Sequence, residues 1–132
     1  MSIVDSQAVA DHYLDWVRRE SAQLPFRPCL ATLLYTPASD AASLQYRDLV
    51  LKDAAKAGFA ARSIEAADAH ALRQRIREVN EDGGVHGLVV LYPLKSSMRD
   101  EDIMDLVLPH KDIEGLHSIN LGYLIKYKVY LD

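Results

Sequence analysis

Two acidic side chains in one loop are the residues of this sequence best suited to bind a polar ligand. Asp112 and Glu114 lie two positions apart in the segment Lys111-Asp112-Ile113-Glu114-Gly115. A carboxylate can accept two parallel N–H donors, and it therefore suits a guanidine-like heterocycle. The alternative is a solvated loop in which Gly115 supplies a turn. The spacing of the two acids fits both interpretations.

A tyrosine earlier in the chain is a second candidate for ligand contact. Tyr46 follows Ser43 by three residues and precedes Val50 by four, so a helix would place all three on one face. On that face the ring could stack on an aromatic ligand, or it could belong to the core.

A strand that ends at a proline is the third feature. The run Gly87-Leu88-Val89-Val90-Leu91-Tyr92-Pro93 is almost wholly apolar, which is typical of a strand covered on both faces. Ligands of open α/β sheets bind at the carboxyl ends of the strands. The end of this strand and the later acidic loop can therefore form one end of a ligand cleft.

Helices and strands are predicted to alternate along the chain. The predicted helices cover residues 6–20, about 40–57, 69–80 after an Asp68 cap, and a short segment that follows a capping box of Ser97 and Asp100. The predicted strands cover residues 29–35, 59–64 and 85–92. Such alternation forms βαβ units with right-handed crossovers. The fold class is therefore α/β, a three-layer domain with a mainly parallel sheet and helices on both faces.

The last residues depart from this alternation. Apolar and other residues alternate from position 123 to position 131, which predicts a terminal strand. Because the pattern runs to the end without a terminator, we expect a truncated chain. A genuine terminal strand is the alternative.

Composition limits the classes of partner. The chain has 132 residues, 49% of them hydrophobic, which fits one domain with a single core. Its net charge of −4 argues against nucleic acid, since nucleic-acid binding uses Lys and Arg to neutralise phosphates. No apolar run approaches the roughly 20 residues that cross a bilayer, so no membrane partner is expected. The lone Cys29 and the lack of a signal peptide favour a cytoplasmic location.

Metal and nucleotide motifs are not visible in the sequence. His86, His110 and His117 lack the i, i+4 pairing of a zinc-binding helix, so we expect no metal site. Neither G-x-G-x-x-G nor a P-loop is present, so a nicotinamide cofactor has no recognisable site in these residues.

Three collinear motifs resemble the N-terminal, folate-binding catalytic domain of the methylenetetrahydrofolate dehydrogenase/cyclohydrolase family. The family's A-S-x-x-Y is matched by residues 42–46, and its N-x-D…V-H-G-[IL]-[LV]-V-Q-L-P-L-P by residues 80–95 with departures. Its P-x-K-D-V-D-G-[FL] and N-x-G-x-L are matched by residues 109–116 and 120–124. The likeness covers nearly the whole chain.

Two departures from the family pattern occur together. The family's catalytic lysine, four residues after the tyrosine, is Val50 here, and the glutamine that hydrogen-bonds it is Leu91. The family's pterin-binding aspartate is Glu114. The cyclohydrolase step needs a group that helps water to add and moves protons, and neither apolar residue can do so. The pattern is therefore most similar to the monofunctional, NAD-dependent dehydrogenase branch, with cyclohydrolase activity lost.

The resemblance implies the catalytic domain of a 5,10-methylenetetrahydrofolate dehydrogenase, an oxidoreductase of one-carbon metabolism. Hydride would pass from methylenetetrahydrofolate to NAD or NADP and give 5,10-methenyltetrahydrofolate. Tyr46 and Glu114 would be the catalytic residues, with Glu114 on the pterin and Tyr46 stacked on the aminobenzoate ring. The implied substrate-binding residues are Ser43, Tyr46, Val50, Leu91, Tyr92, Pro93 and Glu114.

The resemblance also implies partners for this domain. A C-terminal Rossmann-type domain, which these 132 residues lack, would bind the nicotinamide, so activity is expected only with that domain. Family members dimerise, so a homodimer is expected. Two other interpretations fit the sequence: a stand-alone folate-binding module without catalysis, and a structural or regulatory α/β domain.

Overall fold

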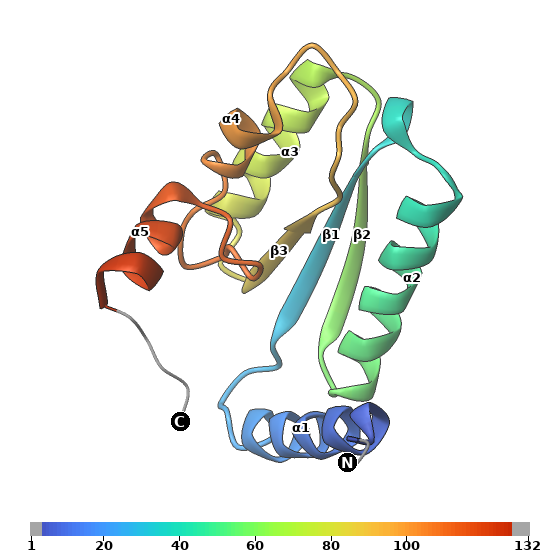
Figure 1. Cartoon of the computed structure of the whole chain (residues 1–132), viewed down its shortest axis with the longest axis vertical. Helices are drawn as coiled ribbons and strands as arrows, with labels where there is room; N and C mark the ends of the chain where they lie inside the picture. The colour runs from blue at the N-terminus through green and yellow to red at the C-terminus, as the bar shows by residue number, and fades with distance from the viewer. Residues whose placement is uncertain (1–3, 128–132) are drawn as a thin grey trace.

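The computed structural model describes residues 4–127 and contains a parallel sheet of three strands. The strands are β1 (Cys29–Tyr35), β2 (Ala60–Ala66) and β3 (Gly87–Val90), in the order β2-β1-β3. The helices are α1 (Ser6–Ser21), α2 (Ala41–Lys56), α3 (Ala69–Glu81), α4 (Asp100–Met104) and α5 (Ser118–Tyr127), with a 3-10 turn, η1, at Thr36–Ala38. Helices and strands therefore alternate from α1 to α4, as predicted (Figure 1).

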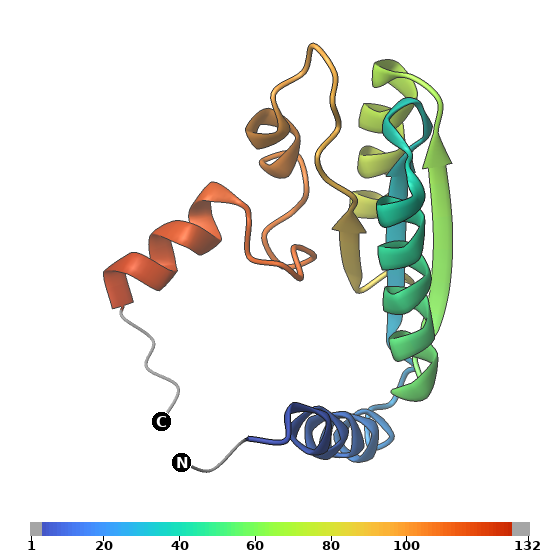
Figure 2. The ribbon, with the colours of Figure 1, turned by 45° about the vertical axis from the view of Figure 1, so that its right-hand side comes forward.

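Both faces of the sheet are covered by helices (Figures 1 and 2). On one face, a large core joins the sheet to α3 and α4; its members include Ala31, Leu33, Val90, Leu72, Ile76 and Ile103. On the other face, a smaller core packs against α2 and contains Leu34, Val89 and Leu91 with the partly buried Leu30 and Val50. A strand directs successive side chains to opposite faces, so a single apolar run serves both layers. The predicted three-layer α/β fold is confirmed.

The central strand is β1. Its residues 29–35 pair in register with residues 60–66 of β2, and residues 30–33 pair with residues 87–90 of β3. β2 lies at an edge and keeps most of its side chains at least partly exposed, which explains its weaker apolar pattern. The three strands end at one edge of the sheet, so the segments that follow them lie close together.

Local capping signals set several helix ends. Asp40 accepts from the Ser43 N–H while Ser43 Oγ accepts from the Asp40 N–H, a capping box at the start of α2. Asp68 accepts from the Ala71 N–H at 2.8 Å, which confirms the predicted cap of α3. Gly58 follows α2 with φ +82°, the left-handed conformation typical of a C-terminal cap.

The predicted capping box of the short helix is wrong. α4 begins at Asp100 itself, and Ser97 lies three residues before it. The Asp100 carboxylate accepts instead from the Leu94 N–H at 3.1 Å, so it stabilises the loop after β3. That strand is also shorter than the predicted 85–92, because its pairing with β1 ends at Val90.

The predicted terminal strand is wrong where the structure describes it, and residues 128–131 lie outside the described part. α5 occupies the segment instead. Its first N–H groups have nearby acceptors, since Ser118 donates to Asp105 and the Ile119 N–H donates to His117 Nδ1. A strand needs a neighbouring strand for its hydrogen bonds, whereas a helix makes them internally. Local hydrogen bonding therefore prevails over the alternating pattern.

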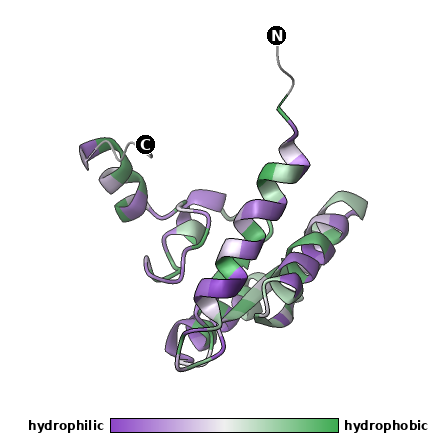
Figure 3. Cartoon of the chain, turned by 90° about the horizontal axis from the view of Figure 1, so that it is seen from below, coloured by the Kyte–Doolittle hydropathy of each residue, from purple (hydrophilic) through white to green (hydrophobic). Residues whose placement is uncertain are grey.

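α1 lies across one end of the sheet and covers neither face (Figure 1). None of its residues is fully buried, and Tyr13 and Trp16 are 60% and 51% exposed. Hydrophobic and hydrophilic bands alternate along this helix when the molecule is seen from below (Figure 3). Neither α1 nor any other helix within residues 4–127 is long and apolar enough to cross a membrane.

Candidate functional site

A hydrogen bond joins the tyrosine and the acidic residue on which the sequence interpretation depends. The Tyr46 hydroxyl donates to Glu114 Oε1 at 3.3 Å, although the two residues are 68 positions apart. Tyr46 belongs to α2, and Glu114 lies in the loop between α4 and α5. Both side chains remain exposed, so a ligand can reach them. We call this pair the Tyr46–Glu114 edge.

The surroundings of Glu114 disfavour its charged form. The side chain as a whole is exposed, but its carboxyl group loses part of its solvent beside Tyr46 and the loop. This desolvation raises the pKa of Glu114 above the ordinary 4.5; the Tyr46 hydrogen bond opposes the rise and the charge of Asp112 adds to it. Desolvation and the charge of Glu114 also raise the pKa of Tyr46, which therefore remains a neutral donor at pH 7.

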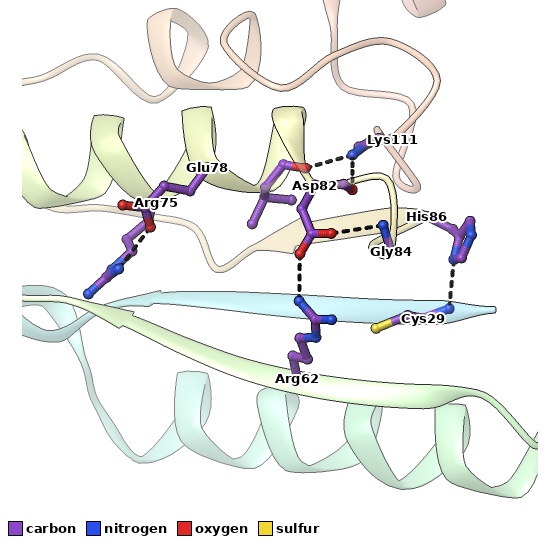
Figure 4. A network of polar contacts seen from close by, with 9 residues as sticks. Cys29, Arg62, Arg75, Glu78, Asp82, Gly84, His86 and Lys111 are labelled. Carbon is purple, nitrogen blue, oxygen red and sulfur yellow. Dashed lines mark hydrogen bonds and ion pairs between the residues drawn. The ribbon is translucent and has the colours of Figure 1, made fainter. Parts of the chain in front are cut away.

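A buried lysine anchors the loop that carries Glu114 (Figure 4). Lys111 is only 5% exposed, and its Nζ donates to Val79 O at 2.6 Å and to Asp82 O at 2.7 Å. These carbonyls lie at the C-terminal end of α3, where a positive charge also meets the negative end of the helix dipole. The Leu88 N–H donates to the Lys111 carbonyl at 2.8 Å, so the loop covers the outer edge of β3. Sequence reasoning missed this anchor.

The second acidic residue of the loop has an internal role. Asp112 Oδ2 accepts from the His117 N–H at 2.8 Å and from Asn120 Nδ2 at 2.9 Å. Burial raises the pKa of Asp112, but these donors and backbone N–H groups such as that of Gly115 outweigh it, and the net shift is downward. Gly115 has φ +69°, which lets the chain turn without steric cost. Glu114 is thus the carboxylate left for an external ligand.

The two apolar departures from the family motifs belong to the same small core. Val50 packs against the small core that contains Leu34, Val89 and Leu91. Leu91 is only 4% exposed. A lysine at position 50 would face this apolar cluster without a polar partner, which is unfavourable. In this chain the family's lysine and its glutamine partner are both replaced by apolar residues, so no polar group is left unpaired in the cluster.

The three residues after β3 do not form one continuous wall. Leu91 joins the core beneath α2, whereas Tyr92 packs against the core beneath α3 and α4, and Pro93 is exposed. Successive side chains of an extended segment face opposite sides. Of the three predicted wall residues, only Leu91 therefore faces the same side as Val50.

The start of α2 is held by contacts that include an unpredicted lysine. Ser43 Oγ accepts from the Asp40 N–H and donates to the Asp40 carbonyl, both at 2.9 Å, so its hydroxyl serves the helix cap. Lys95 Nζ lies 2.7 Å from Asp40 Oδ2, and this hydrogen bond is the main reason that the pKa of Asp40 falls to about 2. The family motif has proline at position 95, so the resemblance held no signal for this ion pair.

An apolar groove of about 460 Å³ lies next to the Tyr46–Glu114 edge. Its lining residues include Pro28, Leu30, Val50, Ala54, Phe59, His86 and Ile113. Cys29 and Gly87, the first residues of β1 and β3, also line it, so it lies toward the amino ends of the strands. Val50, one helical turn after Tyr46, and Ile113, next to Glu114, line this groove, so the polar pair and the groove are neighbours.

The turn after β1 does not fit the pyrophosphate of a dinucleotide. Such a ligand needs glycines in the first strand–helix turn, where the backbone approaches the pyrophosphate. Here that turn is Thr36-Pro37-Ala38, and Pro37 has no N–H to donate.

Two of the histidines, His86 and His117, have structural contacts. His86 Nδ1 accepts from the Cys29 N–H at 3.0 Å (Figure 4). His117 Nδ1 accepts from the Ile119 N–H at 3.0 Å. Within residues 4–127, no group of three His, Cys, Asp or Glu side chains could hold a metal ion.

Known proteins share this sequence and fold. The family profile of the tetrahydrofolate dehydrogenase/cyclohydrolase catalytic domain matches residues 4–114. The bifunctional protein FolD of Pelotomaculum thermopropionicum is 35% identical, over 93% of this chain and 45% of that protein. The chain therefore spans less than half the length of this relative.

Two solved structures have the same fold. The Trypanosoma brucei N5,N10-methylenetetrahydrofolate dehydrogenase-cyclohydrolase, solved with NADP and an inhibitor, superimposes with a TM-score of 0.87 at 27% identity, over 98% of this chain and 46% of that chain. The NAD-dependent 5,10-methylenetetrahydrofolate dehydrogenase of Saccharomyces cerevisiae gives a TM-score of 0.83 at 24% identity, over 95% and 40%. Because the profile also covers most of the sequence, the chain belongs to the tetrahydrofolate dehydrogenase/cyclohydrolase family and has the fold of its catalytic domain.

Proposed function

We propose that the Tyr46–Glu114 edge binds a reduced folate and that this chain is the catalytic domain of a 5,10-methylenetetrahydrofolate dehydrogenase. The hydrogen bond between Tyr46 and Glu114 carries the proposal, because it brings an aromatic ring and a carboxylate to one exposed edge. A pterin offers paired N–H donors to the carboxylate, and an aminobenzoate ring can stack on the tyrosine. Family membership supports the same ligand. Calorimetric titration with tetrahydrofolate tests the proposal: saturable binding supports it, and no binding at millimolar ligand contradicts it.

Each residue has a separate task in this proposal. Glu114 accepts from the pterin, Tyr46 stacks on the aminobenzoate ring, and Val50 with Leu91 gives the reacting carbon an apolar surrounding. The chain would thus bind and orient the methylene carbon for loss of a hydride, a step that depends on alignment. Neither apolar residue can transfer a proton to or from water. We therefore propose dehydrogenase activity without cyclohydrolase activity.

In this proposal the hydride acceptor is NAD or NADP bound by a Rossmann-type domain outside these 132 residues. The turn after β1 is unsuited to a pyrophosphate. One similar structure is described as a complex with NADP and another as NAD-dependent, which supports a nicotinamide as the class of cofactor. Turnover would then need both domains.

We also propose a cytoplasmic location and a homodimer. The buried, unpaired thiol of Cys29 is compatible with a reducing compartment. Sedimentation velocity tests the dimer, since a monomer at micromolar concentration contradicts it.

Folate binding is expected to weaken as the pH falls. The weakening should begin at a higher pH than it would if Glu114 had the pKa of an ordinary glutamate. Binding in this proposal needs the ionised Glu114, whose pKa is raised above 4.5 mainly by desolvation. As the pH falls through this raised pKa, the carboxylate becomes protonated and stops accepting from the pterin. Calorimetric dissociation constants between pH 4.5 and 8 measure the effect. The matched control is Glu114→Gln, whose affinity should follow only the titration of the ligand; the same pH profile in both proteins contradicts the assignment.

Restoring the family's polar pair is expected to create cyclohydrolase activity and to cost stability. Val50→Lys with Leu91→Gln places a lysine and its hydrogen-bonding partner on the side of the sheet that α2 covers. Because Leu91 is buried, we expect the double variant to lose about 2–4 kcal/mol of unfolding free energy. Hydrolysis of 5,10-methenyltetrahydrofolate, followed by its absorbance, should exceed the buffer rate only in the double variant. Hydrolysis by the unmodified chain at a comparable rate contradicts the proposed loss, and Val50→Lys alone is the control for an unpartnered lysine.

A further inference from the structure

We propose that the Tyr92 hydroxyl is a second donor to Glu114 and that it holds this carboxylate in position when a folate occupies the Tyr46–Glu114 edge. Tyr92 is thus a positioning residue that acts through Glu114. The inference rests on the proposed function, because it concerns the same ligand. The experiment below distinguishes failure of this inference from failure of the proposed function.

The first observation is an enclosed hydroxyl group without a protein partner. The Tyr92 hydroxyl oxygen is buried, and no group within residues 4–127 forms a hydrogen bond with it. Buried hydroxyls in folded proteins are nearly always paired, because leaving one unpaired is unfavourable. The family motif to which residues 80–95 were matched has leucine at this position. A partner for this hydroxyl in the ligand-bound state would remove that cost.

The second observation is the composition of the hollow beside Tyr92. It measures about 10 Å³, at the lower limit of what one water molecule needs. Its lining is apolar except for Tyr92, Asp112 and Glu114. A protein carboxylate is therefore a better partner for the hydroxyl than solvent.

Glu114 is the carboxylate that can accept further hydrogen bonds. Asp112 already accepts from the His117 N–H and from Asn120. Glu114 accepts a single hydrogen bond among the described residues, from Tyr46, whereas a carboxylate can accept about four.

Burial and the negative charges near Tyr92 keep its hydroxyl able to donate to Glu114. Burial, followed by the charges of Asp100, Glu114 and Asp112, raises the pKa of Tyr92, so the phenol stays protonated and can donate. Asp100 also faces the phenol, but its Oδ1 accepts from the Leu94 N–H and its side chain does not line the hollow.

The two tyrosines lie on opposite sides of the sheet; Tyr46 binds Glu114, and Tyr92 shares a hollow with it. Tyr46 belongs to α2, whereas Tyr92 packs against the core beneath α3 and α4. When the N–H groups of a ligand engage the carboxylate from the α2 side, the Tyr92 hydroxyl can donate from the other side. The carboxylate then has donors on both sides, and the enclosed hydroxyl has an acceptor. This arrangement favours the ionised form that the pterin requires.

The test compares Tyr92→Phe with the matched control Tyr13→Phe, which removes a hydroxyl from an exposed tyrosine of α1. We expect Tyr92→Phe to weaken tetrahydrofolate binding about fivefold to tenfold in calorimetry, and to move the pH of half-maximal binding upward. Its urea midpoint should equal or exceed that of the unmodified chain, because the variant removes an unpaired buried group. Tyr13→Phe should change neither quantity.

A double-variant cycle with Glu114→Gln separates positioning from other effects. If Tyr92 acts through Glu114, Tyr92→Phe should change affinity by less than about twofold in the Glu114→Gln background. An equal loss in both backgrounds, unchanged affinity, or a lowered urea midpoint overturns the inference while leaving the proposed function intact. If the unmodified chain does not bind tetrahydrofolate, the proposed function fails and this inference fails with it.

Discussion

Glu114→Gln is expected to weaken tetrahydrofolate binding by about tenfold to a hundredfold, the largest effect on affinity of any single substitution in this chain. The substitution keeps the size of the side chain but removes one acceptor oxygen and the negative charge. The new NH2 group would face the N–H donors of the pterin, and donors do not bind donors. Calorimetric dissociation constants at pH 7 measure the loss.

The fold should survive this substitution. Since the pKa of Glu114 is raised in the folded protein, proton binding favours the folded state at low pH, and this contribution is lost as the pH rises through that pKa. The ionised carboxylate therefore adds no stability at pH 7, and Glu114→Gln should unfold at the same urea concentration or a slightly higher one. Glu20→Gln on α1 is the matched control and should bind as the unmodified chain does. Equal affinity of Glu114→Gln and the unmodified chain would remove Glu114 from the site.

Lys111→Met is expected to give the largest loss of stability, about 2–4 kcal/mol of unfolding free energy. Methionine has a similar length but cannot donate to the carbonyls of Val79 and Asp82, which the Lys111 ammonium group now binds at 2.6 and 2.7 Å. Hydrogen bonds from a charged donor are stronger than neutral ones. Among the described residues, the Val79 carbonyl would keep only the Asp82 N–H at 3.3 Å, and the Asp82 carbonyl only the Val85 N–H at 3.1 Å. Urea unfolding followed by circular dichroism measures the change.

The same substitution should also release the loop that presents Glu114. Lys111 lies three residues before Glu114, so tetrahydrofolate binding is expected to weaken together with stability. Lys52→Met, at an exposed position on α2, is the matched control and should change stability by less than about 0.5 kcal/mol. A loss below about 1 kcal/mol for Lys111→Met would show that the loop is held mainly by other contacts.

Local signals in the sequence were sufficient for most elements. The strand predicted over residues 29–35 is β1, because an unbroken apolar run suits a strand with helices on both faces. Asp68 caps the start of α3 and Gly58 follows α2, since a side-chain acceptor and a residue free to adopt positive φ act on their own neighbours. These signals act within a few residues, so the sequence shows them directly.

Predictions failed where distant partners decide the structure. Within the described residues 123–127, the alternating pattern has no neighbouring strand, and Asp105 supplies an acceptor for the start of α5 instead. Ser97 and Asp100 have the spacing of a capping box, yet Asp100 binds the backbone of Leu94. In each case an interaction outside the local pattern determines the outcome.

The candidate site was partly predictable for the same reason. Tyr46 and Glu114 were linked through the family motifs, and their hydrogen bond places them at one edge. Lys111 and Lys95 gave no local signal, because their partners are carbonyls of α3 and the cap of α2. Leu91 and Tyr92 face opposite sides of the sheet, as successive residues of an extended segment do. The sequence predicts this only if the chain is known to stay extended after β3.

Amide chemical-shift mapping of the 132-residue chain during titration with tetrahydrofolate tests the central claim most directly. If the Tyr46–Glu114 edge binds the folate, the largest shifts should fall on the residues around position 46 of α2 and on the loop around position 114. Shifts confined to the apolar groove near Phe59 and His86, or no shifts at millimolar ligand, would contradict it.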